Sequence, residues 1–422
     1  MCERRKSMSV QPQPGPAAQT MRPAQTVGMS MILALGIMMA FGPLSHDMYL
    51  PAFPMIESDF ATNASMVQLS LTACLVGAAL GQIVMGPISD QLGRKYPLIA
   101  GLAVYVISSL LCAWVPTIEA FIAMRFIQGL SGASGIVIAR AISRDLFSGP
   151  ALTRFSATLS IIFGAAPTLG PIFGGQLTEH WHWQAVFYAL AGIALVLLIY
   201  AVFGLKESLP KERRATGGFA QVKRNFVTLF KDRFYLGLAL TQGFTGACMF
   251  GYISGSPFVL QTLHGVSPQG FSLIFAINAF GHIIMAQVCG RLAGRVPERR
   301  MIGVGIAFSV TGSLLVLISV LTGAGLWLLL PGFFLPVAAT GCVNTACYSL
   351  ALSRYGQFAG TASGLIGVLT FVLSGSVSPL TGLGGGEAAW PMGAVMTFAA
   401  MCAMLAFLTL VRKNSQGQPA EA

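Results

Sequence analysis

Long apolar stretches recur along this chain, and short polar connections separate them. An α-helix needs roughly 20 apolar residues to cross the ~30 Å hydrocarbon core of a bilayer. The backbone can satisfy its hydrogen bonds in lipid only as helix bundles or closed barrels, and stretches this long favour helices. Several stretches exceed about 25 residues, so we expect tilted spans or spans that extend beyond the bilayer. The pattern predicts an all-α membrane protein of twelve transmembrane helices, over residues 29–52, 66–89, 96–115, 119–141, 152–178, 183–205, 234–262, 268–292, 300–321, 325–352, 357–383 and 390–411.

One connection, over residues 206–233, is longer and more charged than the others and separates six predicted helices from six. Many transporters are built from two such repeats. Residues 86–95 after the second span resemble residues 290–300 after the eighth, since both begin with Gly and end in basic residues, although Gly294 replaces Asp90. We therefore predict two pseudo-symmetric six-helix halves: a disordered cytoplasmic N-terminal tail at 1–28, a six-helix half at 29–205, a cytoplasmic connecting loop at 206–233, a second half at 234–411 and a cytoplasmic tail at 412–422.

Composition supports a membrane protein without catalytic machinery. Hydrophobic residues make up 55% of the chain and charged residues 9%, whereas an ordinary soluble protein carries about a quarter charged residues. The first 28 residues lack the apolar core and cleavage site of a signal peptide. Seven of the eight cysteines lie in apolar stretches without a Cys-x2-Cys pair, so we interpret them as packing residues and predict no metal site. Without a zinc motif, nucleotide loop or Ser-His-Asp grouping, we predict no enzyme and no cofactor, and we expect a proton gradient or the substrate's own gradient to supply energy.

The distribution of positive charge predicts the orientation of the chain. The formal net charge is +11, and 24 of the 25 Lys and Arg residues fall on one side of the twelve-span arrangement. Cytoplasmic loops are enriched in Lys and Arg, so we place both termini in the cytoplasm. All five tryptophans fall at the opposite ends of spans, as an aromatic belt requires: Trp114, Trp181, Trp183, Trp327 and Trp390.

Asp47, near the end of the first apolar stretch, is the one carboxylate that we place inside a span. A carboxylate in hydrocarbon is costly and by default faces a cavity with a function. The alternative is that Asp47 lies near its helix end, within reach of interfacial water. Desolvation favours the protonated carboxyl and a nearby arginine opposes it, so Asp47 and Arg125, the basic residue inside the fourth span, form our predicted proton-coupling site. His46 is a further candidate for protonation, or a hydrogen-bonded packing residue, although neighbouring helix residues point about 100° apart.

The segment from Gly86 to Lys95 resembles the signature loop of the major facilitator superfamily between spans 2 and 3. In physical terms, Gly86 permits close helix approach, Gly93 makes the turn, and Asp90 complements the dipole of a neighbouring helix. Arg94 is placed to reach a carboxylate on span 4. The alternative is a generic polar turn with positive-inside charge. The resemblance implies a major facilitator fold for the twelve helices, and a conformational-switch motif of Gly86, Asp90, Gly93, Arg94, Lys95 and Asp145.

Two further stretches resemble motifs of the antiporters in this superfamily. Arg125-Phe-Ile-Gln-Gly is similar to a segment in which antiporters keep a buried arginine linked to proton transfer. Gly170-Pro171-Ile-Phe-Gly174-Gly175 in span 5 resembles the motif regarded as characteristic of the antiporter branch. Its small residues let helices pack backbone to backbone, and Pro171 bends the span.

At a finer level, residues 30–411 resemble the Bcr/CflA subfamily, which comprises drug:proton antiporters linked to bicyclomycin and chloramphenicol resistance. His46 departs from the subfamily, where an apolar residue is more common, and this leaves open whether Asp47 titrates alone. The segments that carry the resemblance are Asp47-Met-Tyr-Leu-Pro, Arg140-Ala-Ile-Ser-Arg-Asp145-Leu, Gly255-Ser-Pro-Phe-Val and Ala359-Gly-Thr-Ala-Ser.

The resemblance implies a monomeric multidrug efflux transporter of the bacterial inner membrane, exporting chloramphenicol- or bicyclomycin-like amphipathic drugs in exchange for protons. Its implied partners are a small-molecule substrate, protons and the lipid bilayer, with no nucleic acid. A proton-coupled exporter of a metabolite such as a sugar or amino acid, an inward symporter, and a receptor or scaffold without transport stay open as alternatives. A cavity for varied drugs favours aromatic and hydrogen-bonding side chains, and our substrate-binding candidates are Tyr49, Gln128, Gln242, Phe250, Asn278 and Asn344.

Overall fold

The computed structural model describes residues 28–147, 149–214, 228–355, 359–383 and 388–412. The predicted tails, up to residue 27 and from residue 413, lie outside the described residues, as does much of the predicted connecting loop. Within the described residues the long helices of the first half are α1 (Met29–Asp47), α3 (Ala64–Leu92), α4 (Lys95–Trp114), α5 (Ile118–Leu146), α6 (Gly149–His180) and α7 (Gln184–Phe203). Those of the second half are α9 (Arg233–Pro257), α10 (Pro268–Leu292), α11 (Glu298–Thr322), α12 (Leu326–Arg354), α13 (Ala359–Val377) and α14 (Trp390–Ala406).

The prediction of twelve membrane helices in an all-α fold is confirmed. Eleven of the described helical segments are long and apolar enough to cross a membrane. The remaining long helix, α6, is 32 residues long, and its Gly, Pro, Thr and Ser residues make it less apolar. It packs between α1 and α10 and so joins the two halves of the molecule.

The first predicted span is not one continuous helix. α1 ends at Asp47, a turn over Met48 and Tyr49 follows, and a short 3-10 helix η1 (Leu50–Ala52) leads into α2 (Phe53–Asp59). Pro51 and Pro54 explain the interruption, since proline lacks the N–H that a helix interior needs and favours the first positions of a helix. The break leaves Asp47 at a helix end.

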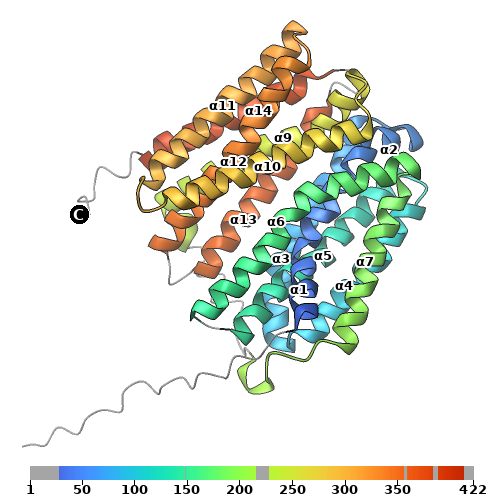
Figure 1. The fold of residues 1–422 in the computed structure, drawn as a ribbon, viewed down its shortest axis with the longest axis vertical. Helices are drawn as coiled ribbons and strands as arrows, with labels where there is room; N and C mark the ends of the chain where they lie inside the picture. Colours follow the sequence, from blue (N-terminus) through green and yellow to red (C-terminus); the bar gives the residue numbers. More distant parts are fainter. Residues whose placement is uncertain (1–27, 148, 215–227, 356–358, 384–387, 413–422) are drawn as a thin grey trace, which may run out of the picture.

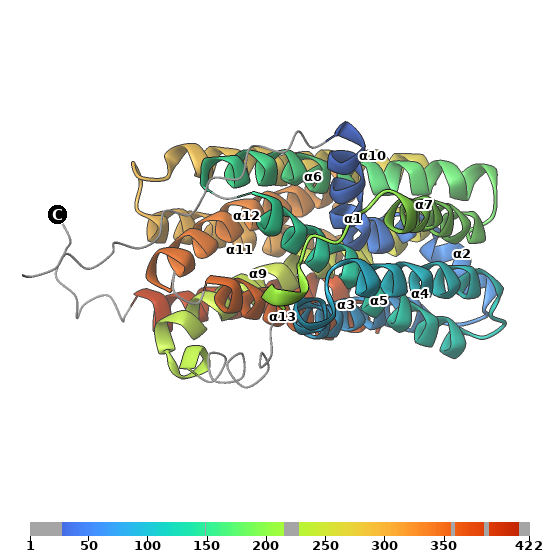
Figure 2. The same ribbon diagram turned by 90° about the horizontal axis from the view of Figure 1, so that it is seen from below.

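The two halves lie side by side, and Figure 1 shows the blue-to-green first half against the yellow-to-red second half. We call the end of the bundle where α1 begins and η6 (Phe407–Arg412) ends the terminal end, and the opposite end the distal end. The halves converge towards the distal end, near α2, and diverge towards the terminal end. Seen from below in Figure 2, α6 and α10 lie at one rim of the bundle.

Six hydrogen bonds join the halves within the described residues, and all of them lie in the distal part of the bundle. Examples are Gln68 Nε2, which donates to the carbonyl of Ser254 at 3.1 Å, and Thr72 Oγ1, which donates to the carbonyl of Gly375 at 2.8 Å. The others are donated by Ser65 to Pro379, by Gln261 to Pro51, by Ser272 to Pro171 and by Ser378 to Gln68. The described structure is therefore closed at the distal end.

Within the first half, glycines let α3 and α5 approach until their backbones touch. A side chain at Gly77 would overlap the carbonyl of Phe126, and one at Gly81 would overlap the carbonyl of Leu130. We expected Gly86 to serve this purpose, but a Cβ there would meet its nearest neighbour, Val137, only at 4.0 Å. The close approach lies one to three helical turns earlier on α3.

The cysteines are not all simple packing residues. Cys289 on α10 and Cys342 on α12 form a disulfide, with their Cα atoms 5.6 Å apart. Cys74, Cys112, Cys248 and Cys347 are free and buried, as expected. The sequence interpretation was wrong for the first pair because residues 53 positions apart meet only through helix packing.

Candidate functional site

Asp47 lies in the interior of the molecule, where its residue is 4% exposed. Among the described residues its side chain has one polar partner, the neighbouring His46, whose Nδ1 lies 3.5 Å from Asp47 Oδ1. Both side chains are buried. Both residues belong to the last turn of α1, and their side chains come within this distance although adjacent helix positions point about 100° apart. The structure thus holds a buried carboxylate with a single long contact to an imidazole.

Helix α6 covers Asp47 with the glycines of the predicted antiporter motif. A Cβ at Gly170 would lie 3.2 Å from the Cβ of Asp47, and a side chain at Gly174 would overlap the carbonyl oxygen of Met48. On its other side α6 meets α10, because the carbonyl of Pro171 accepts a hydrogen bond of 2.7 Å from Ser272. Gly175 faces the same serine. The motif therefore connects the acidic end of α1 to the second half.

Arg125 is fully buried on α5, but it forms no ion pair with Asp47 among the described residues. Its Nη2 donates to the carbonyl oxygen of Ser45 at 2.8 Å, and its Nη1 donates to Gln128 Oε1. The guanidinium lies 4.1 Å from the centroid of the Tyr49 ring, a cation–π arrangement. The predicted direct pairing of Arg125 with Asp47 is therefore not present among the described residues. The guanidinium instead bonds the carbonyl of Ser45, two residues before Asp47.

The second half contributes aromatic and amide groups opposite Asp47. The ring of Phe250 lies 6.4 Å from that of His46, centroid to centroid. Asn278 Nδ2 donates to the hydroxyl of Tyr252 at 2.8 Å. Sequence reasoning missed Tyr252. The signal that could have identified it is its position, since it places a hydroxyl group within an apolar span. Of our substrate candidates, Phe250 thus lies beside His46, the neighbour of the acid, and Asn278 is bonded to Tyr252.

The other four substrate candidates differ in their surroundings. Tyr49 and Gln128 are buried and contact Arg125, so in this structure they hold the guanidinium. Gln242 on α9 and Asn344 on α12 each have a buried side-chain oxygen that lacks a hydrogen-bond partner among the described residues. An unpaired buried acceptor costs free energy. The structure brings Phe250 to His46 and Asn278 to Tyr252, and it leaves Gln242 and Asn344 with unused acceptors.

At the terminal end of the first half, Arg94 joins α3, α4 and α5. Its Nε donates to Asp145 Oδ2 at 2.9 Å, as expected from the sequence, and its Nη1 donates to Asp90 and to Ser89. Asp90 lies in the last turns of α3 rather than at the start of a neighbouring helix. Gly93 makes the turn with φ of +96°, a conformation that favours glycine.

Glu207 completes this cluster and was missed by sequence reasoning. Its carboxylate accepts hydrogen bonds from the backbone N–H groups of Arg94 at 2.8 Å and Lys95 at 3.2 Å, at the start of α4. Burial raises the pKa of Glu207, but these N–H groups, that of Leu209 and the charge of Arg214 outweigh it and hold the pKa below its usual range. A negative charge therefore lies at the start of α4, where it complements the helix dipole. Glu207 in the segment after α7 supplies this charge, and not Asp90 as predicted.

Two six-helix halves with a buried acid between them define a multi-pass membrane transporter. The family model described as Major Facilitator Superfamily matches residues 31–379, and this chain belongs to that family. It is a transporter and not an enzyme.

Sequence identity to individual relatives supports a subfamily within this family. The chain is 38% identical over 388 residues to an uncharacterised MFS-type transporter, YdgK, of Bacillus subtilis (strain 168), covering 92% of this chain and 96% of that one. It is 29% identical to a bicyclomycin resistance protein homolog of Haemophilus influenzae, covering 91% and 96% of the two chains. With other relatives named for chloramphenicol and multidrug resistance, these similarities confirm the Bcr/CflA resemblance.

A solved structure shares the fold. A bacterial homolog of the human lysosomal transporter Spinster, described as inward-facing and unoccupied, superimposes with a TM-score of 0.75 at 17% identity. The alignment covers 93% of this chain and 98% of that one.

Proposed function

We propose that this chain exports amphipathic drugs of the chloramphenicol or bicyclomycin type across the bacterial inner membrane in exchange for protons. Both termini lie in the cytoplasm, so the terminal end faces the cytoplasm and the distal end the periplasm. The relatives named for drug resistance support the substrate class. The observation that carries the proposal is Asp47, which is 4% exposed and lies where the two halves meet.

Asp47 suits a role as the proton carrier. A buried carboxylate with one contact at 3.5 Å lacks the partners that would hold it permanently ionised. The charge of Arg125, bonded to the carbonyl of Ser45, favours the ionised form, while desolvation favours the protonated one. Small changes in hydration as the halves move would therefore change the proton affinity. His46 is placed to share the proton.

Coupling requires that proton and drug have different affinities for the two conformations. The proton meets this requirement if water reaches Asp47 from the cytoplasm in one conformation and from the periplasm in the other. The drug would compete with the proton through the groups opposite Asp47, namely Phe250, Tyr252 and Asn278. In this scheme Arg94 and Asp145 stabilise one arrangement of the terminal end as the halves rock.

The test is drug-dependent proton flux in inverted membrane vesicles whose lumen has been acidified by respiration. We expect chloramphenicol or bicyclomycin to discharge the gradient with the wild type and not with Asp47→Asn. Glu119→Gln is the matched control, because it removes an exposed carboxylate at the distal end of α5, and it should behave as the wild type.

Other outcomes are equally informative. Discharge by Asp47→Asn at the wild-type rate would contradict the role of Asp47 and move attention to His46. Discharge by sugars or amino acids but by none of the drugs would replace drug export with metabolite export. A proton-independent uptake of drug would contradict antiport.

A further inference from the structure

The outward face of α10 is continuously apolar through the membrane. Leu273, Ile277, Phe280, Ile284 and Val288 are each 40–63% exposed. Their spacing of three or four residues places them on one side of the helix. The side of α10 that bonds Tyr252 through Asn278 carries buried residues instead. Because α10 lies at the rim of the bundle, this face meets hydrocarbon.

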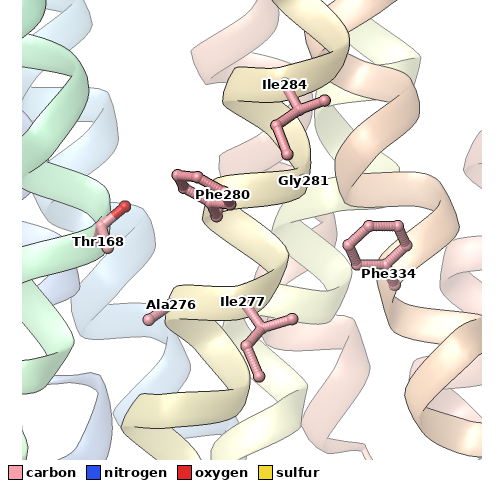
Figure 3. A pocket seen from close by; sticks show the side chains of 7 residues that line it. All are labelled: Thr168, Ala276, Ile277, Phe280, Gly281, Ile284 and Phe334. Carbon is pink, nitrogen blue, oxygen red and sulfur yellow. The ribbon is translucent and has the colours of Figure 1, made fainter.

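A groove of about 450 Å³ runs along this face between the two halves. Its walls are Thr168 on α6, Phe334 on α12 and five residues of α10 between Ala276 and Ile284, and they are almost entirely apolar. Figure 3 shows α10 between the other two helices, with Ala276 and Phe280 on the side of Thr168 and Ile277 on the side of Phe334. The groove lies next to the contact between Ser272 and Pro171, on its terminal side.

The same helix face ends in positive charge. Arg291 follows Val288 by three residues, so it continues the stripe, and it is exposed. Arg295 follows, also exposed. Residues 291–300 contain four arginines and one glutamate, Glu298, whose carboxylate lies 3.5 Å from the hydroxyl of Ser349. An anionic group is therefore favoured at this end of the stripe.

The distance between the groove and the charge matches one leaflet of a bilayer. Phe280 and Arg291 are separated by eleven residues, or ~16 Å at the helical rise of about 1.5 Å per residue. Half of a hydrocarbon core of about 30 Å is ~15 Å. A chain that starts at the headgroup level beside Arg291 thus reaches the groove near the middle of the membrane.

We propose that an anionic phospholipid of the leaflet at the terminal end binds here, with its phosphate at Arg291 and Arg295 and an acyl chain in the groove beside Phe280. The apolar walls select hydrocarbon, and the arginines select a negative headgroup. Because Thr168 belongs to one half and the rest of the groove to the other, the acyl chain occupies the space between α6 and α10 on the terminal side of their contact. The bound lipid stabilises the present arrangement and has to leave when the halves approach at the terminal end. This holds whatever substrate is carried.

The test is photolabelling of the full-length protein in phosphatidylcholine nanodiscs. A trace of phosphatidylglycerol with a photoreactive acyl chain is added, and labelled peptides are identified by mass spectrometry. We expect labels on α10 near Phe280 and on α6 near Thr168. Arg291→Gln and Arg295→Gln should each weaken labelling roughly fivefold, since each basic residue near the surface contributes about that factor.

Matched variants separate the two parts of the site. Arg144→Gln removes an exposed arginine at the terminal end of the other half and should leave labelling unchanged. Ala276→Trp fills the groove from α10 and should abolish labelling near Phe280. Thr168→Phe fills it from α6 and serves if the first variant does not fold, as judged by its melting temperature.

The remaining outcomes overturn the proposal. Equal labelling by photoreactive phosphatidylcholine, insensitive to both arginine variants, would mean that any hydrocarbon chain enters. Displacement of the label by drug but not by excess phosphatidylglycerol would identify the groove as a drug site. Labelling elsewhere on the surface, unaffected by Ala276→Trp, would show that no lipid is held in the groove.

Discussion

At the scale of single residues, the most informative side chains are charged groups whose partners are backbone atoms. Arg125 is neutralised by no carboxylate among the described residues and relies on the carbonyl of Ser45 and on Gln128. Glu207 relies on the N–H groups at the start of α4. Backbone groups do not titrate, so these partners keep the same charge at every pH. This property makes Glu207 testable apart from transport.

We predict that Glu207→Gln lowers the melting temperature of the purified protein at pH 7 by a few degrees. The folded-state pKa of Glu207 lies below its usual value, so the ionised form stabilises the fold. That stabilisation is complete above about pH 4.3 and is lost as the pH falls through the folded-state pKa. The gap between variant and wild type should therefore close on acidification. Glu212→Gln, in the nearby 3-10 helix η2 (Lys211–Arg213), should match the wild type throughout. A pH-independent gap would contradict the argument.

At the scale of helices, most helix ends were predictable and several contacts were not. The apolar stretches end where polar residues begin, so the span predicted at 268–292 matches α10 at Pro268–Leu292. The break after Asp47 was missed because the run stays apolar through Pro51. The partner of Arg125 depends on the rotation of α5 relative to α1, which hydrophobicity does not encode. Glu207 lies 113 residues from Arg94, and only the fold brings them together.

The packing of α6 on α1 gives a prediction at this scale. Gly174→Ala should abolish transport and lower the melting temperature, because its side chain would overlap the carbonyl of Met48 and push the helices apart. Gly164→Ala on the same helix meets no atom within 4 Å and should be neutral or slightly stabilising, since alanine is favoured over glycine in helices by about 1 kcal/mol. Thermal melting and vesicle transport of both variants test this. Equal behaviour of the pair would show that the close approach is not required.

At the scale of the whole molecule, the two halves touch at one end, which fits one of two alternating states. The sequence predicted two halves from the length and charge of the connection at 206–233. It did not predict which end is closed, because the same helices must allow both arrangements. In the structure the donors on α3, Gln68 and Thr72, hold the distal end of α9 and α13.

We predict that a disulfide between Thr72→Cys and Gly375→Cys traps this state and stops transport. A Cβ at position 375 would lie 3.3 Å from Cγ2 of Thr72, and the Thr72 hydroxyl donates to the carbonyl of Gly375 at 2.8 Å, so cysteine side chains at these two positions can meet. Oxidation should block proton-coupled efflux in vesicles, and reduction should restore it. Thr72→Cys alone is the control for the native cysteines. Continued transport by the oxidised pair would mean that the distal ends do not separate.

The six hydrogen bonds between the halves share a chemical form: each donor is a serine, threonine or glutamine side chain, and each acceptor is a backbone carbonyl. Every residue type carries that carbonyl, so mutation at an acceptor position preserves the bond while mutation at a donor position deletes it. Tolerance to substitution should thus differ between the residues that join the halves. It should be low at donors such as Gln68 and Thr72 and higher at acceptors such as Ser254. Each half supplies three of the six donors, so both halves contain acceptor positions that can change in sequence while the contacts between the halves persist.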